Sequence, residues 1–222
     1  SEMCIRDRDI LKQFQNGEVK YLDLRFTDPK GKLQHLTLDG SVVNDELFAD
    51  GAFFDGSSIS GWKAINESDM VLMPDPSTAI IDPFTAQPTM IVFCDILDAV
   101  TKEPYERDPR GVARRAEEYL RTSGIGDTIY VGPEAEFFVF DDVKFQVDMN
   151  KSMFEVDSVE GPYNSGRSYE SNNLGHRPGV KGGYFPVPPI DSAQDLRTEF
   201  LEELKNLGLK MEKHHHEVAP SQ

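Results

Sequence analysis

The sequence predicts an α+β protein with two domains, and three observations favour this class. The first 105 residues contain short segments of alternating apolar and polar residues, separated by turns with Pro and Gly. Two later segments, 107–124 and 191–208, carry the start and stop signals of helices. A strongly strand-like segment, 128–145, lies between them. We expect a small sheet packed with a helix, ending near Tyr105, and then a second, α/β domain from residue 106.

Local patterns predict the elements of the first domain. Val19–Asp28 and Leu33–Leu38 alternate around the turn Pro29–Lys32, which predicts a hairpin. Residues 44–51 predict a short helix that Asn44 or Asp45 caps. Proline turns separate three further expected strands, at 70–75, 78–84 and 89–97.

The first long helix of the second part has signals at both ends. Asp108 is expected to cap it, Pro109 occupies its first position, and Gly124 ends it. Residues 128–145 are strongly strand-like.

The last predicted helix begins where Ser192 and Asp195 resemble a capping box, and it stops at Gly208. A strand is expected after it, over 209–219. The segment 148–183 is polar, rich in glycine and without a sustained period. Loops longer than about 12–15 residues inside a domain are usually functional or disordered, so this segment is a candidate functional loop.

Composition excludes several classes of function. The net charge of −16, from 23 Lys+Arg against 39 Asp+Glu, argues against a surface that binds nucleic acid or an anionic membrane. It fits carboxylates that bind cations, and equally a solvated acidic surface. The two cysteines, Cys4 and Cys94, do not make a disulfide scaffold. With no apolar signal core and no apolar run of about 20 residues, we expect a soluble, cytoplasmic protein.

The stretch "GPEAEFFVF" holds two candidate metal ligands. Glu134 and Glu136 are two apart in a predicted strand, so both point to one face. Two like charges near a core are costly unless a cation neutralises them, and oxygen ligands favour hard ions such as Mg²⁺ or Mn²⁺. The alternative is that both carboxylates lie on a solvated sheet face, and spacing alone does not separate the two.

The final stretch "EKHHHEVAPSQ" raises a second candidate site. On a strand, His215 and Glu217 share one face, while Glu212, His214 and His216 share the other. Adjacent histidines therefore diverge, which disfavours a three-histidine cage, and only His214 and His216 form a pair of the kind zinc uses. The run is shorter than a usual purification tag.

Asp55 is a further candidate because it stands on a glycine turn behind two phenylalanines, in "FFDGSSISGW". A carboxylate in a semi-apolar loop can serve as a base, and it can equally form a turn with Gly56. The chain has no P-loop and no dinucleotide-binding glycine motif. Carboxylates that hold metal ions would therefore have to bind the phosphates of any nucleotide.

Five stretches together identify a family. "DLRFTDPKGK", "FFDGSSISGWKAINESDMVLMPD", "GPEAEFFVFDD", "GHRPGVKGGYFPVPPIDSAQDLR" and "HHHEVA" resemble bacterial type I glutamine synthetase, in the right order and spacing from about Asp9 to Gln222. The resemblance implies an N-terminal β-grasp domain, residues 9–105, and the first half of a catalytic α/β domain, residues 106–222. It also implies a twelve-subunit double ring.

The resemblance implies the reaction as well. Members join L-glutamate and ammonia with ATP through a γ-glutamyl phosphate, using two or more Mg²⁺ or Mn²⁺ ions. By position in the motifs, Glu136 and Glu217 resemble ligands of the metal on the glutamate side, and Glu134 resembles a ligand on the nucleotide side. Glu212 matches a position that contacts ATP. Asp55 matches the aspartate that binds ammonium and takes its proton, on a loop that reaches the neighbouring subunit.

Other parts of the motifs have implied places too. Ser58 and Trp62 lie on the same loop as Asp55, and the segment that ends in "KGGYFPVPP" matches the loop lining the channel of the ring.

Two departures from the family bear on these expectations. Residues 1–8, "SEMCIRDR", do not resemble a family N-terminus, and we expect them to be an artefactual leader. The chain has about half the family's length, so we expect an amino-terminal fragment that is inactive alone. The alternatives are a related ligase that amidates a polyamine or another amine, and a non-catalytic ring or scaffold protein on the same fold. The intact "DGSS" stretch argues against the first alternative, and the presence together of the candidate carboxylates Glu134, Glu136, Glu217 and Asp55 argues against the second.

Overall fold

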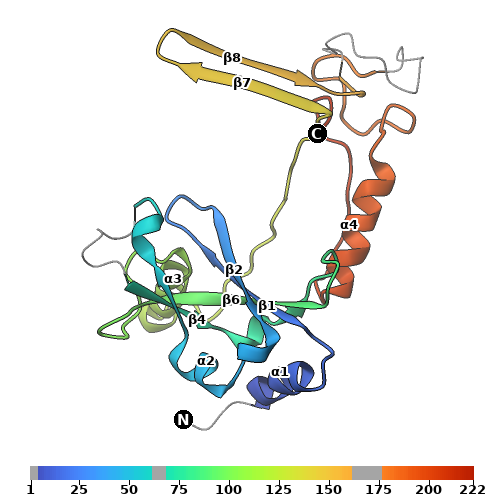
Figure 1. The fold of residues 1–222 in the computed structure, drawn as a ribbon. Helices are drawn as coiled ribbons and strands as arrows, with labels where there is room; N and C mark the ends of the chain where they lie inside the picture. Colours follow the sequence, from blue (N-terminus) through green and yellow to red (C-terminus); the bar gives the residue numbers. More distant parts are fainter. Residues whose placement is uncertain (1–4, 62–68, 162–176) are drawn as a thin grey trace. The chain divides into compact units, whose positions relative to one another are not determined.

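The structure, a computed structural model, describes residues 5–61, 69–161 and 177–222 (Figure 1). The chain divides into two compact units, residues 1–131 and 132–222. Among the described residues, no helix has the length and apolarity that crossing a membrane requires.

A mixed sheet forms the first unit. Its strand order is β2-β1-β6-β4-β3, and β5 pairs with β6 as well. Strands β1 and β6 are parallel and the other pairs are antiparallel. The strands are β1 (Tyr21–Thr27), β2 (Leu33–Asp39), β3 (Ala52–Asp55), β4 (Asp69–Pro74), β5 (Ile80–Ile81) and β6 (Thr89–Asp98). The predicted hairpin is confirmed, since Leu24 pairs with Leu36 in a regular antiparallel ladder between β1 and β2.

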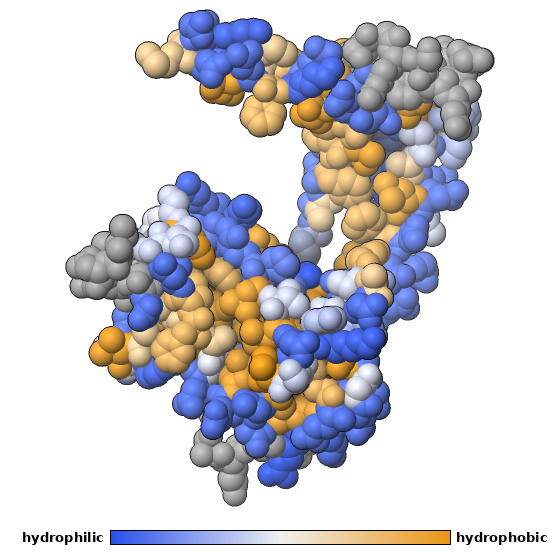
Figure 2. Space-filling view, viewed as in Figure 1, coloured by the Kyte–Doolittle hydropathy of each residue, from blue (hydrophilic) through white to orange (hydrophobic). Residues whose placement is uncertain are grey.

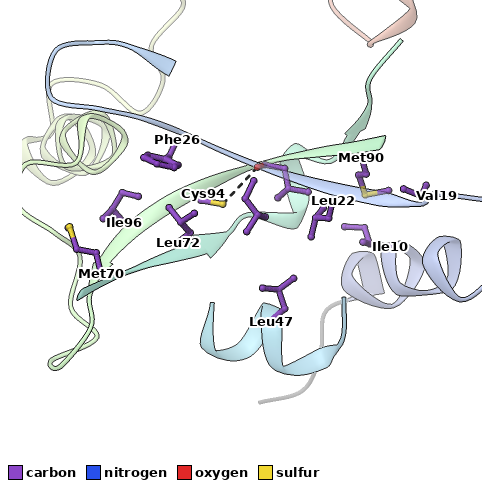
Figure 3. Close-up of a cluster of buried hydrophobic side chains, with 12 residues drawn as sticks. Ile10, Val19, Leu22, Phe26, Leu47, Met70, Leu72, Met90, Cys94 and Ile96 are labelled. Atoms are coloured by element: carbon purple, nitrogen blue, oxygen red, sulfur yellow. Dashed lines mark hydrogen bonds between the residues drawn. The ribbon is translucent and has the colours of Figure 1, made fainter. Parts of the chain in front are cut away.

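Two helices, α1 (Ile5–Gln15) and α2 (Asp45–Asp50), pack on one face of this sheet. Figure 3 shows Ile10 of α1 and Leu47 of α2 beside the inward side chains of the strands. Asn44 caps α2 by accepting a hydrogen bond from the Leu47 amide at 3.0 Å. The buried cluster consists of Ile10, Val19, Leu22, Leu24, Phe26, Leu47, Met70, Leu72, Met90, Val92, Cys94 and Ile96. This continuous core gives the first unit its own hydrophobic interior.

Charged side chains attach helix α3 (Pro109–Ser123) to the sheet. Arg110 donates to Asp75 of the β4–β5 connection at 2.7 Å and to Asp95 of β6 at 3.1 Å. The predicted signals of this helix are confirmed. Asp108 accepts from the Arg110 amide at 3.1 Å, and Gly124 adopts the left-handed conformation at φ 73°.

The second unit contains a long hairpin and one helix. Strands β7 (Asp142–Asp148) and β8 (Lys151–Asp157) pair antiparallel along their whole length, and α4 spans Gln194–Asn206. The prediction of loop from residue 148 is therefore wrong over β8. The hairpin is solvated on both faces, because Phe145 and Phe154 on one face and Lys144 and Glu155 on the other are all exposed. Figure 2 shows apolar residues at the surface of both units.

Two predicted strands are not formed. Of the segment 128–145, only the end enters a strand, because β7 begins at Asp142, and residues 209–219 form no strand. Their β-propensity is real, but a strand needs a ladder partner, and the described residues supply only isolated bonds. Examples are Val139 N to Ser221 O at 2.8 Å and Gly183 N to Val218 O at 3.0 Å.

The predicted capping box of α4 is also wrong. The N-cap is Ala193, whose methyl side chain cannot accept a hydrogen bond, and the Ser192 hydroxyl donates to Glu160. The stop at Gly208 is confirmed, since Gly208 follows the C-cap Leu207 with φ 89°.

Candidate active site

Glu134 and Glu136 lie on an extended, solvent-exposed segment of the second unit. The prediction that a strand holds them is wrong, because residues 131–140 take part in no ladder, and of the two alternatives for the carboxylates the structure has the solvated one, since these residues are all exposed. Glu136 nevertheless has a defined partner. Its Oε2 accepts a hydrogen bond from Gln222 Nε2 at 3.0 Å, across 86 residues of sequence. This contact brings the segment of Glu136 to the end of the chain.

Glu217 is half-buried and meets the same residue through its backbone. Its amide donates to Gln222 O at 3.0 Å. The Glu217 carboxylate accepts from the Val218 amide at 3.0 Å and stands 3.7 Å from His215 Nδ1. Gln222 therefore links Glu136 and Glu217, two of the candidate metal ligands.

The three adjacent histidines have three different environments. His214 Nδ1 accepts from Arg197 Nε at 3.2 Å, and its Nε2 lies 3.0 Å from the Thr198 hydroxyl, both on α4. His216 is buried and contacts Glu160 through Nε2. The structure thus directs His214 and His216 to separate partners rather than to one ion.

Aromatic rings surround His215. The rings of Tyr184 and Phe185 stack at 4.1 Å between centroids, and the Phe185 ring meets His215 edge-on at 4.5 Å. The backbone of Phe185 has φ 58°, which a bulky residue rarely adopts. His215 Nδ1 also lies 3.0 Å from the main-chain oxygen of His216. This contact and the two aromatic rings hold the His215 side chain on the same side of the chain as Glu217.

A shallow cavity of about 240 Å³ lies beside these histidines. It is lined by Phe185, Pro186, Asp191, Gln194, Arg197, His214, His215 and His216. The guanidinium of Arg197 pairs with Asp191, and both residues are buried. The cavity therefore has a rigid polar wall on the side of α4.

The sequence patterns did not predict the buried polar residues that lie around the three histidines. Glu160, Asp191 and Arg197 are buried polar residues. Glu160 contacts His216 and Arg197 donates to His214, both distant in sequence, while Asp191 pairs with Arg197. Glu160 stands in a segment with the polar composition of a loop, so its burial leaves no signal in the sequence. Charged residues are rarely buried unless they are paired. The burial of Glu160 in the structure is therefore the observation that marks it as a residue with structural partners.

Glu212 is exposed on the extended segment that follows α4. It belongs to the second unit together with Glu134, Glu136 and Glu217.

Asp55 lies in the first unit, at the end of β3, where its backbone is opposite Asp69 in the antiparallel register with β4. Its Oδ1 accepts from the amide of Ser57 at 2.9 Å and from the Ser57 hydroxyl at 2.6 Å. These bonds cap a short 3₁₀ turn, Gly56–Ser58, so the turn expected at Gly56 is formed. Ser58 is exposed at the end of this turn, and Trp62 lies outside the described residues.

The donor chemistry of the candidate residues suits a hard divalent cation, because Glu134, Glu136 and Glu217 offer only carboxylate oxygens. Within residues 5–61, 69–161 and 177–222, no three His, Cys, Asp or Glu side chains are grouped closely enough to hold an ion. Glu136 and Glu217 converge on Gln222 without completing a coordination shell.

Comparison with known families matches nearly the whole chain. The family model described as "Glutamine synthetase, beta-Grasp domain" matches residues 18–99, and "Glutamine synthetase, catalytic domain" matches residues 106–222. The glutamine synthetase of Rhizobium meliloti is 64% identical over 214 residues, which are 96% of this chain and 46% of that protein. The glutamine synthetase of Escherichia coli is 58% identical over 95% of this chain and 45% of its own length.

A solved structure gives the same fold. The cryo-EM structure of Plasmodium falciparum glutamine synthetase superposes with a TM-score of 0.84 at 22% identity, over 97% of this chain and 42% of that one. The chain therefore spans about half the length of the curated relatives that it matches.

Proposed function

The chain belongs to the glutamine synthetase family, and we propose that it forms the amino-terminal half of an ATP-dependent glutamate–ammonia ligase. The observation that carries this proposal is 64% identity to a glutamine synthetase over 96% of the chain. Identity at this level extends through both family domains, so it supports the reaction as well as the fold.

The proposed reaction makes L-glutamine in two steps. A side-chain oxygen of L-glutamate attacks the γ-phosphorus of ATP, the bond to the β-phosphate oxygen breaks, and ADP leaves. Ammonia then attacks the carbonyl carbon of the γ-glutamyl phosphate, and inorganic phosphate leaves. Asp55 is the proposed base, which binds ammonium and accepts its proton before the attack.

The carboxylates of the second unit have the remaining proposed roles. Glu136 and Glu217 are the proposed ligands of a divalent ion on the glutamate side, and Glu134 is the ligand of one on the nucleotide side. Their common donor chemistry and the shared contact of Glu136 and Glu217 with Gln222 support this assignment. Bound Mg²⁺ or Mn²⁺ would offset negative charge on phosphate and carboxylate oxygens. Glu212 is the proposed contact to ATP.

The proposal includes the setting of the enzyme. The whole protein is expected to form a homo-oligomeric double ring of twelve subunits in the cytoplasm. Residues 9–105 and 106–222 are its proposed β-grasp and partial catalytic domains. The 222 residues alone are expected to have little or no activity, because they span 46% of the Rhizobium meliloti relative.

A fusion protein tests the function directly. The 222 residues are joined at Gln222 to the carboxyl-terminal remainder of the Rhizobium meliloti relative, and phosphate release is measured with glutamate, ammonium and Mg-ATP. We expect ammonia-dependent turnover in the fusion. The Asp55→Ala variant should lose about 100-fold or more in turnover, as removal of a general base does. The matched control is Asp50→Ala, an exposed aspartate at the end of α2.

The alternatives give different results in the same assay. Turnover with putrescine but not with ammonia would indicate the polyamine ligase. A folded fusion that neither turns over nor binds Mn²⁺ and ATP by titration calorimetry would indicate a scaffold protein. Near-normal ammonia-dependent turnover in Asp55→Ala would remove Asp55 from its role.

A further inference from the structure

Glu160 is a buried side chain that joins three separate segments of the second unit. Only 6% of the residue is exposed. Its Oε1 contacts His216 Nε2 and accepts from the Ser221 amide at 3.2 Å. Its Oε2 accepts from the Ser192 hydroxyl at 2.6 Å. A carboxyl group with so little access to water is tolerated because these donors satisfy both of its oxygens.

A neighbouring serine strengthens the same junction. The hydroxyl of Ser158 accepts from the Glu160 amide at 3.2 Å, and the Ser221 hydroxyl donates to it at 2.6 Å. Both serines are buried. Ser221 is therefore held at its amide by Glu160 and at its hydroxyl by Ser158, which fixes the last turn of the chain.

A continuous series of bonds leads from Glu160 to the candidate metal ligands. His216 is 2% exposed, and its ring Nδ1 donates to Glu217 O at 2.6 Å. Gln222, the neighbour of Ser221, accepts from the Glu217 amide and donates to the Glu136 carboxylate. Glu160 thus contacts the residue that precedes each partner in this series: His216 precedes Glu217, and Ser221 precedes Gln222.

The segments that carry the two candidate ligands need such a support. Neither Glu136 nor Glu217 lies in a helix or strand, so no regular backbone ladder fixes its position. Carboxylates must be held to within a fraction of an ångström for a metal site to work, and partners outside the ligand set supply that order.

We propose that Glu160 is a positioning residue for the site, which fixes Glu217 through His216 and, through Ser221 and Gln222, orients Glu136. The inference rests on the proposed function for its catalytic consequence, but the positioning itself is a property of this chain. Within the described part of the chain, the bonds of the Glu160 carboxylate go to Ser192, His216 and Ser221 and not to a proposed metal ligand, so it acts through its neighbours.

Amide hydrogen exchange on the 222-residue chain tests the positioning without any activity. In Glu160→Ala, we expect the Glu217 and Ser221 amides to exchange about tenfold faster, as the loss of roughly one hydrogen bond implies. The Leu204 amide within α4 should stay within about twofold, because loss of a local contact leaves the helix closed. The control Glu155→Ala removes an exposed glutamate of β8 and should change neither rate.

Metal dependence in the fusion protein tests the catalytic consequence. In Glu160→Ala, the Mg²⁺ concentration for half-maximal turnover should rise about tenfold, the effect typical of losing an outer partner of a metal site. Glu160→Gln retains an acceptor for Ser221 and His216 and should recover most of this loss. A residue that only stabilises the fold would lower the amount of folded enzyme without moving this concentration.

The outcomes separate the two proposals. Unchanged exchange at Glu217 and Ser221 in Glu160→Ala would overturn the positioning role. Faster exchange, combined with an unchanged Mg²⁺ requirement in an active fusion, would overturn its catalytic consequence. An inactive but folded parent fusion refutes the proposed function, while faster exchange still supports the positioning. If Glu160→Ala does not fold, the same measurements are made on Glu160→Asp. The shorter aspartate keeps a carboxylate but withdraws it from His216 and Ser221 by one methylene.

Discussion

Replacement of Gly183 by alanine should displace the segment that carries Glu217. Gly183 is buried, and its amide donates to Val218 O at 3.0 Å. A Cβ on Gly183 would lie 2.7 Å from Glu217 O and 2.7 Å from His216 Cε1. Neither neighbour can move easily. The His216 ring contacts Glu160 through Nε2, and the Nδ1 of the same ring donates to Glu217 O.

The expected size follows from these contacts. Overpacking of a tight interior costs about 1–3 kcal/mol, and displacement of the Gly183–Val218 bond costs about 1 kcal/mol more. The loss of chain flexibility in the unfolded state offsets about 0.4–1 kcal/mol of this. Gly183→Ala should therefore destabilise the second unit by about 2 kcal/mol. In Gly179→Ala, the added Cβ meets nothing within 4 Å, so this variant should be neutral or slightly stabilised.

Native-state hydrogen exchange as a function of urea measures this difference, with peptides from residues 132–222 as the reporters. The two variants change the same atom count in one loop, so their difference isolates the steric contact. If the free energies of opening in Gly183→Ala and Gly179→Ala agree within about 0.5 kcal/mol, the close approach of Gly183 to residues 216–217 is refuted.

Two further predictions concern the first unit. Asp108→Ala should destabilise it by about 2–3 kcal/mol, because it removes the cap of α3 and leaves the Ile96 amide, now 3.1 Å from Asp108 Oδ2, buried without an acceptor. Urea-dependent exchange in peptides from residues 89–123 checks this, with the exposed Asp127→Ala as control; equal stability of the two variants would contradict it. Burial opposes ionisation of Asp75, but hydrogen bonds from Ser77 and Arg110 outweigh it and lower the pKa below the ordinary 3.8. Asp75 therefore stabilises the fold above pH 3.8, and this stabilisation is lost as the pH falls through the lower folded pKa. In Asp75→Asn, stability should depend less steeply on pH in that acid range, and an unchanged slope in urea titrations would exclude the role of Asp75.

Local signals in the sequence predicted the elements whose causes are local. The cap at Asp108 and the stops at Gly124 and Gly208 depend on one or two residues and their immediate neighbours. The β1–β2 hairpin needed only an alternating pattern on each side of a turn.

Apart from the capping box expected at Ser192, the wrong predictions concern elements that need a partner. Residues 128–140 have the composition of a strand, but pairing decides whether a strand forms, and no ladder reaches them within the described residues. Strand β8 is the opposite case, because Lys151–Asp157 is mostly exposed and so lacks a clear alternation, yet it pairs along its full length with β7.

By itself, the sequence determined the family, through five motifs in a fixed order, and it named the carboxylates proposed for the chemistry. The tertiary structure decided what surrounds those carboxylates. Glu160 and His216 are 56 residues apart, and Glu136 and Gln222 are 86 apart. The burial of Glu160 and the meeting of Glu136 with Gln222 depend on how distant segments fold together. A contact between distant residues leaves no local pattern, because periodicity reports only on neighbours along the chain.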